Sequence, residues 1–363
     1  MENLRIPGPT PLPSEVLQAM TKQMINHRGE EFEQILNGVT DKLKQLFQTK
    51  GDVFLFTASG TGGLEAATVN TLSPGDKVLS VSNGFFGDRF ADIARNFGAE
   101  VIPLNFEWGK AADVDAIRRT LQAEPKIKAV LVTHNETSTG VTNDLASISS
   151  VVKEFDKLLL VDAVSSLGSI NLPIDDWHCD VTVTGSQKGW MAPPGLAMVS
   201  VSQEAWQAHA SARMPRCYWD FTQAKRYLER GQTPWTPAIS TVFALSVSLE
   251  MMLREGLSNI IARHARVAKT AREGIKSLGL SLFAEESYAS NTVTAVAASD
   301  GLDVKKMLKI LEEEHQVVLS GGQQKLDGKI FRIGHLGWVT EDDIKSVISA
   351  LKVVLPQAGF RGG

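Results

Sequence analysis

The chain has 363 residues, of which 43% are hydrophobic and 21% are charged, so it has enough apolar side chains for a large core and is not a disordered chain. Its 37 Lys and Arg against 41 Asp and Glu give a net charge of -4, which excludes a general nucleic-acid binder. Two cysteines are too few for a disulfide framework, an iron–sulfur cluster or a thiolate zinc site. We expect a cytoplasmic protein without a signal peptide or a membrane-spanning segment.

Residues 1–13 are predicted to form an extended arm, because prolines at positions 7, 9, 11 and 13 exclude a helix. Over residues 14–254, short apolar runs alternate with helical patterns. Such alternation predicts right-handed crossovers and a large α/β domain with a mostly parallel sheet of about seven strands, covered on both faces. The apolar runs are 53–56, 77–81, 101–104, 129–132, 158–161, 181–183 and 196–201.

The pattern changes in the last third of the chain. Apolar residues recur at helical spacing over 257–278, after Gly256. Strand-like runs at 292–298 and 330–333 lie between helical patterns at 303–314 and 340–354, and Thr340 followed by acidic residues is typical of a helix start. These elements predict a smaller α+β domain over residues 255–363.

A turn of small residues follows the first apolar run of the large domain. Residues 59–63 read SGTGG and open a helical pattern at Leu64. A strand, a turn and a helix amino terminus bring backbone N–H groups and the positive end of the helix dipole to one point, where a phosphate binds. A tight turn without a ligand explains the same residues. The dinucleotide fingerprint G-x-G-x-x-G would need a glycine at position 65, where the chain has Glu65.

Two charged residues follow later strands. Asp162 ends the run that begins at residue 158, and Lys188 lies between the run 181–183 and a turn rich in proline and glycine. A carboxylate at the end of a buried parallel strand lies where open α/β sheets bind ligands. A lysine among apolar and small residues has a lowered pKa, as imine chemistry requires. A capping aspartate and a solvated loop lysine are the alternatives when each residue is taken alone.

One ligand explains these three features together. Pyridoxal phosphate needs a lysine for its aldehyde, a carboxylate that keeps its ring nitrogen protonated, a helix terminus for its phosphate and a planar group against its ring. Phe86 is the candidate for the planar group, and core packing is its competing role. His27 and His134 have no second ligand at metal spacing, so we predict no metal site.

Several segments resemble, in this order, the class V aminotransferases, in the branch of the alanine–glyoxylate and serine–pyruvate or serine–glyoxylate aminotransferases. The resemblance covers nearly the whole chain and implies a fold-type-I transferase dependent on pyridoxal phosphate. The segments are 7–11 (PGPTP), 59–62 (SGTG), 133–140 (THNETSTG), 160–168 (LVDAVSSLG), 185–188 (GSQK) and 331–337 (FRIGHLG).

The resemblance implies a role for each matching residue. Lys188 matches the lysine that forms the Schiff base, and Asp162 matches the partner of the pyridine nitrogen. Arg332 matches the arginine that binds the substrate carboxylate, and the backbone at Gly8 would close the same pocket. Further cofactor contacts are implied for Thr61, Gly62, Gly63 and Gln187 at the phosphate, for Phe86, where relatives often have tryptophan, and Val164 on the ring faces, and for Thr137 at the ring hydroxyl. Thr236 matches a hydroxyl that the neighbouring subunit lends to the phosphate, which implies a homodimer with shared active sites.

The implied reaction moves an amino group from alanine or serine to glyoxylate or pyruvate in two half-reactions. Aspartate, or another donor used within the family, is an alternative, and Arg28, Arg213 or Arg216 could then supply a second carboxylate contact. A catalytically silent scaffold with this fold and a dinucleotide oxidoreductase are alternatives from other classes. The expected partners are small amino acids and 2-oxo acids, and neither nucleic acid nor a membrane is expected.

Overall fold

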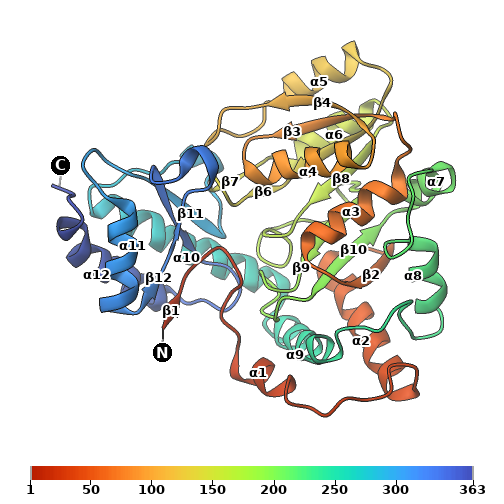
Figure 1. Cartoon of the computed structure of the whole chain (residues 1–363), viewed down its shortest axis with the longest axis horizontal. Coiled ribbons are helices and arrows are strands. Elements are labelled where there is room, and N and C mark those ends of the chain that lie inside the picture. Colours follow the sequence, from red (N-terminus) through yellow and green to blue (C-terminus); the bar gives the residue numbers. More distant parts are fainter. Residues whose placement is uncertain (1, 362–363) are drawn as a thin grey trace.

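The computed structural model describes residues 2–361 and contains a seven-stranded sheet with the order β2-β10-β9-β8-β5-β3-β4 (Figure 1). Strand β10 is antiparallel to both of its neighbours, and the other neighbouring strands are parallel. All seven predicted runs are strands of this sheet, so the mostly parallel α/β fold is confirmed. The strands are β2 (Asp52–Thr57), β3 (Lys77–Ser82), β4 (Glu100–Asn105), β5 (Ile127–Thr133), β8 (Leu158–Asp162), β9 (Val181–Gly185) and β10 (Leu196–Val201).

Helices cover both faces of this sheet. Successive residues of a buried strand point to opposite faces, so Leu159 and Val161 pack in one core and Leu160 packs in the other. The first core also contains α2 (Glu30–Phe47), α5 (Val114–Ala123), α6 (Leu145–Glu154) and α9 (Ile239–Glu255). The second core contains α3 (Gly60–Thr71), α4 (Phe85–Asn96), α7 (Gln203–Ser211) and α8 (Phe221–Leu228).

The last part of the chain forms a separate core around a three-stranded antiparallel sheet with the order β11-β14-β13. The three predicted helices are present, and Thr340 forms a capping box with Asp343 at the start of the last one. The boundary at residue 255, where α9 ends, stays a prediction. The elements are α10 (Leu257–Ser277), η1 (Glu286–Tyr288), β11 (Val293–Ala297), α11 (Val304–His315), β13 (Ser320–Gly321), η2 (Gln324–Leu326), β14 (Ile330–Gly334) and α12 (Glu341–Gln357).

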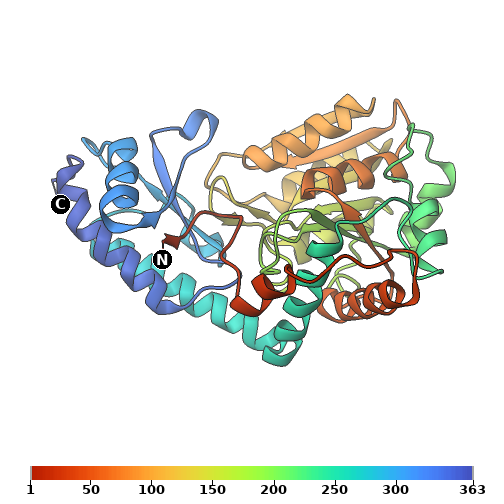
Figure 2. The ribbon, with the colours of Figure 1, turned by 60° about the horizontal axis from the view of Figure 1, so that its bottom comes forward.

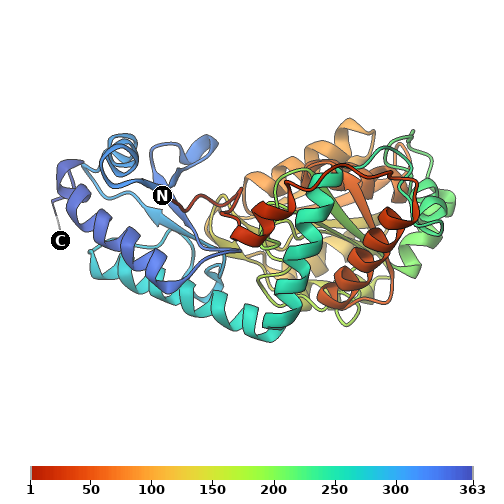
Figure 3. The same ribbon diagram turned by 90° about the horizontal axis from the view of Figure 1, so that it is seen from below.

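The amino-terminal arm crosses from this smaller part to the large sheet (Figure 2). Residues 2–13 contain no helix, as predicted, and β1 (Asn3–Leu4) pairs with β12 (Val317–Val318). Arg5 forms an ion pair with Asp343 at 3.1 Å, and further along the arm the Thr10 amide donates to the Gln187 carbonyl at 3.1 Å. The arm then continues into α1 (Ser14–Ala19), which lies beside α9 (Figure 3). Within residues 2–361, no helix is long and apolar enough to cross a membrane.

Candidate active site

Five loops meet at one edge of the large sheet. Strands β2, β9, β8, β5 and β3 run in the same direction, so their carboxyl ends lie along this edge. This is the edge at which open α/β sheets bind ligands. The residues that end or follow these strands are Thr61, Lys188, Asp162, Thr137 and Phe86, so the fold brings these predicted site residues to one edge.

The amino terminus of α3 offers open backbone donors. Ser59 at the N-cap makes no side-chain cap, and the amides of residues 60–62 have no acceptor within residues 2–361. The chain is tightly packed here, because a Cβ on Gly62 or Gly63 would lie 2.6 or 2.5 Å from a neighbouring side chain. Open N–H groups at the positive end of a helix dipole form an anion site, which Thr61 can complete with its hydroxyl.

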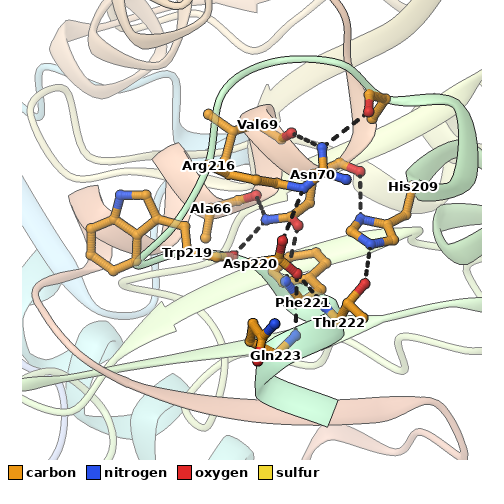
Figure 4. Close-up of polar contacts among 11 residues, drawn as sticks. Ala66, Val69, Asn70, His209, Arg216, Trp219, Asp220, Phe221, Thr222 and Gln223 are labelled. Atoms are coloured by element: carbon orange, nitrogen blue, oxygen red, sulfur yellow. Dashed lines mark hydrogen bonds and ion pairs between the residues drawn. The ribbon is translucent and has the colours of Figure 1, made fainter. Parts of the chain in front are cut away.

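A buried polar cluster fixes α3 to the segment before α8 (Figure 4). The side chain of Asn70 donates to the Trp219 carbonyl at 2.7 Å and accepts from the Phe221 amide at 3.0 Å. His209 contacts the Asn70 carbonyl at 3.2 Å, and Arg216 donates to the Val69 carbonyl at 3.1 Å. The Trp219 ring packs against Gly62, so this cluster holds a side chain that contacts the turn at the start of α3.

Gln187 and Val164 lie beside the α3 turn. The Gln187 side-chain oxygen is buried without a hydrogen-bond partner within residues 2–361. A Cβ on Gly185 would lie 3.0 Å from this oxygen and 3.6 Å from the Gly60 amide nitrogen, so the carboxamide lies close to the open donors. A Cβ on Gly60 would lie 2.5 Å from Val164, which therefore packs against the same turn. A buried side-chain oxygen without a donor is costly in free energy unless a ligand or water binds it.

Asp162 is a buried carboxylate whose charge is stabilised by few polar contacts. Its Oδ1 accepts from the Val164 amide at 3.0 Å, and it forms no ion pair within the described part of the chain. Burial raises its pKa from 3.8 to about 7, the Val164 hydrogen bond opposes this rise, and the negative charge of Glu136 adds to it. A positively charged ligand group would therefore bind strongly to the Asp162 carboxylate.

Lys188 lies between the sheet edge and the arm. Its Nζ donates to the Pro7 carbonyl, and a Cβ on Gly8, whose φ is +113°, would lie 2.6 Å from the same Nζ. Burial lowers the pKa of Lys188 to about 8, which the charge of Asp162 opposes. The arm therefore covers an amine that is partly neutral near neutral pH, and only glycine fits at position 8.

Glu136, to which the sequence assigned no role, fastens the loop that carries Phe86. This fully buried carboxylate accepts from the amides of Phe86 and Gly87, each at 3.0 Å. Its other oxygen accepts from the Ser138 amide at 3.0 Å and hydroxyl at 2.6 Å. The N-cap residue Gly84 has no side chain, and a Cβ there would lie 2.3 Å from Glu136. Helix α4 is thus capped from another strand, and this cap fixes the backbone of Phe86.

Arg332 on β14 joins the smaller part of the chain to the site. Its Nη1 donates to the Thr137 carbonyl at 3.1 Å and to the Gln323 side chain at 3.2 Å, and its Nε donates to the Gly321 carbonyl at 3.0 Å. Nη2 has no acceptor within residues 2–361. Burial lowers the pKa of Arg332 to about 10, and the charge of Glu136 opposes this change. The guanidinium is held at three points and keeps free N–H groups for an anion.

Thr236 is not brought to the other residues within this chain. It is exposed on the loop between α8 and α9, next to the Tyr218 and Trp235 rings, which stack 5.8 Å apart. Arg28, Arg213 and Arg216 are not brought to these residues within this chain either. Arg28 donates to the carbonyls of residues 233 and 234, Arg213 is exposed, and Arg216 belongs to the cluster below α3.

The residues at this edge fit pyridoxal phosphate. The open amides of α3 suit its phosphate, and Gln187 beside them has a side-chain NH2 group that can donate to the same anion. The buried carboxylate of Asp162 suits a protonated ring nitrogen, and Lys188 suits the aldehyde. Val164 and Phe86 supply apolar faces near these groups.

Comparison with known proteins gives one consistent family. The family model described as aminotransferase class V matches residues 3–334. A soluble hydrogenase 42 kDa subunit from Anabaena cylindrica is 45% identical over 98% of this chain and 94% of that protein. An L-aspartate–glyoxylate aminotransferase from Paracoccus denitrificans is 38% identical over 98% of this chain and 91% of that protein. The crystal structure of an alanine–glyoxylate aminotransferase from Nostoc sp. superposes with a TM-score of 0.94 at 31% identity, covering 98% and 95% of the two chains.

Proposed function

Because the chain belongs to the class V aminotransferase family, we propose that it uses pyridoxal phosphate to move an amino group from alanine or serine to glyoxylate or pyruvate. The observation that carries this proposal is the meeting of Lys188, Asp162 and the open amino terminus of α3 at one sheet edge. Glyoxylate as acceptor is supported by the names of the two aminotransferase relatives described above.

Each residue at the edge has a chemical task in this proposal. When bound, pyridoxal phosphate supplies a cationic ring that withdraws the electrons left at the substrate Cα after its proton departs. Asp162 holds the proton on the ring nitrogen, since its buried carboxylate otherwise lacks a cationic partner. The amides of residues 60–62, the Thr61 hydroxyl and the side-chain NH2 group of Gln187 would donate to the phosphate.

Lys188 moves the proton. Its lowered pKa keeps a useful fraction of neutral amine near neutral pH, so Nζ could take the proton from the substrate Cα and return it on the other side of the amino nitrogen, two bonds away. Arg332 binds the substrate carboxylate through its free N–H groups and so fixes which Cα bond faces Lys188. The arm at Pro7 and Gly8 covers Lys188 and excludes water. The first half-reaction turns an amino acid into its 2-oxo acid, and the second returns the amino group to another 2-oxo acid.

We further propose a homodimer in which Thr236 reaches the phosphate of the partner subunit. Support comes from its exposure in this chain and from the neighbouring Tyr218 and Trp235, which are 39% and 37% exposed although both are aromatic. Light scattering should give a mass near twice that of the 39.4 kDa chain. A cytoplasmic location, supported by the low cysteine content, is part of the same proposal.

The variant Lys188→Ala tests the proposed function. We expect turnover with alanine and glyoxylate to vanish, while the protein still binds the cofactor without a covalent bond. Lys225→Ala is the matched control, because Lys225 lies away from this edge and pairs with Asp52 at 2.9 Å. Full activity in Lys188→Ala would refute the assignment, and a wild-type protein that converts no amino acid would favour a silent scaffold.

A further inference from the structure

Arg89 is a positively charged residue on α4, the helix that begins with Phe85 and Phe86. It lies on α4, one turn after Phe85 and Phe86, and its Cζ is 4.6 and 5.1 Å from the centroids of the two rings. The side chain is half-buried, and its guanidinium makes no hydrogen bond or ion pair within residues 2–361. Arg95 on the same helix, by contrast, pairs with Asp92. The two aromatic faces hold the Arg89 guanidinium while its N–H groups stay free.

The charge of Arg89 acts on the residues that carry the chemistry. Burial raises the pKa of Asp162, and the positive charge of Arg89 opposes this rise. Burial lowers the pKa of Lys188, and the charge of Arg89 lowers it further. Arg332 also lowers the pKa of Lys188. The charges of two guanidinium groups from different parts of the chain, Arg332 on β14 and Arg89 on α4, therefore act on the amine of Lys188.

The acidic residues nearby are already engaged. Glu136 is saturated by the amides of Phe86 and Gly87 and by Ser138, and Asp162 is the proposed partner of the cofactor. A donor such as alanine has one carboxylate, which Arg332 binds, and this leaves Arg89 without an anion. A second carboxylate on the donor would give Arg89 a partner with matching fork geometry.

We infer that Arg89 binds the side-chain carboxylate of a dicarboxylic amino donor, so the substrate range extends from alanine and serine to aspartate or glutamate. This inference rests on the proposed function, because it assigns a second binding group to the same active site. Arg89 is then a specificity-determining residue. It takes no part in proton transfer, and its effect is greatest for substrates with two carboxylates.

Specificity constants of the holoenzyme test the inference. We expect wild-type protein to convert aspartate or glutamate, and Arg89→Gln to lose about 30-fold more kcat/KM for that donor than for alanine. Arg89→Lys keeps the positive charge but lacks the planar guanidinium, so its kcat/KM for the dicarboxylic donor should lie between those of wild type and Arg89→Gln. Arg95→Gln is the matched control on the same helix and should leave both specificity constants unchanged.

Binding of non-reacting acids gives a second measurement that does not depend on turnover. In calorimetry we expect succinate to bind the holoenzyme more tightly than propionate. In Arg89→Gln the ratio of the two dissociation constants should fall about tenfold. Equal losses for aspartate and alanine, or an altered subunit mass in Arg89→Gln, would overturn the inference and assign Arg89 to packing. Conversion of alanine but of neither aspartate nor glutamate would also overturn the inference about Arg89. If the enzyme converts no amino acid and binds succinate weakly, both this inference and the proposed aminotransferase function are rejected.

Discussion

Replacing Asp162 with asparagine should stabilise the cofactor-free protein at alkaline pH while it abolishes amino transfer. Asp162 is buried, and burial raises its pKa from 3.8 to about 7. Asparagine has the same shape and keeps an oxygen that accepts from the Val164 amide at 3.0 Å, but it carries no charge. The variant therefore removes an uncompensated buried carboxylate that serves only the bound cofactor.

The magnitude follows from the two pKa values. Between them, the folded protein keeps a proton that the unfolded chain releases, so the free energy of unfolding of the wild type falls as pH rises through this window. The advantage of Asp162→Asn grows from almost nothing near pH 4 to about 4 kcal/mol at about pH 8. Above the folded pKa the advantage stays constant.

Urea denaturation of the cofactor-free proteins from about pH 5 to about pH 8 measures this difference. Asp76→Asn is the contrasting control. Asp76 forms an ion pair with Lys128 at 2.9 Å and accepts from the Ser73 amide at 2.7 Å, so its replacement should not stabilise the protein. An Asp162→Asn variant no more stable than wild type near pH 8, or a difference independent of pH, would refute the reasoning.

Three other predictions concern the surroundings of the site. Glu136→Gln turns one acceptor oxygen into a donor that faces backbone N–H groups, so we expect about tenfold weaker cofactor binding and an altered visible circular dichroism spectrum. Cofactor binding and dichroism equal to those of wild type would show that Glu136 does not position the Phe86 loop. Gly8→Ala introduces a Cβ within 2.6 Å of Lys188 Nζ at a φ of +113°, so we expect kcat/KM to fall more than about tenfold, and an unimpaired variant would show that the arm moves freely. Burial lowers the pKa of three histidines to about 4 or about 3, so their ring signals in histidine-selective NMR should not titrate between about pH 8 and about pH 5. Each should cost about 1 kcal/mol of stability near pH 5.5, because the unfolded chain binds protons there that the folded chain does not. A titration midpoint near the ordinary histidine value would contradict this. These histidines are His134, His264 and His335.

The strands and the edge that carries the site follow from local patterns. Short apolar runs between helical patterns are enough to predict a parallel sheet, and a parallel sheet places its carboxyl ends together. Asp162 and Lys188 could therefore be predicted to meet, since each ends or follows a buried strand. Thr340 could be recognised as a helix cap because the capping interaction is local.

The roles of Glu136 and Arg89 could not be read from the sequence in the same way. Glu136 lies in a short strand after β5, and its partners at Phe86 and Gly87 become neighbours only because β3 and β5 are adjacent in the sheet. Arg89 follows Phe85 and Phe86 at helical spacing, which is equally typical of a solvated helix face. Arg216 could be expected in the site, and only the tertiary structure shows that the Val69 carbonyl holds it elsewhere.

The most direct test is a visible absorbance spectrum of the purified protein, followed by separate titrations with alanine, serine and aspartate. We predict a band from cofactor bound to Lys188, which at least one of these amino acids converts to the amine form of the cofactor while the matching 2-oxo acid accumulates. A protein that binds added pyridoxal phosphate, but whose spectrum none of these amino acids changes, would contradict the account.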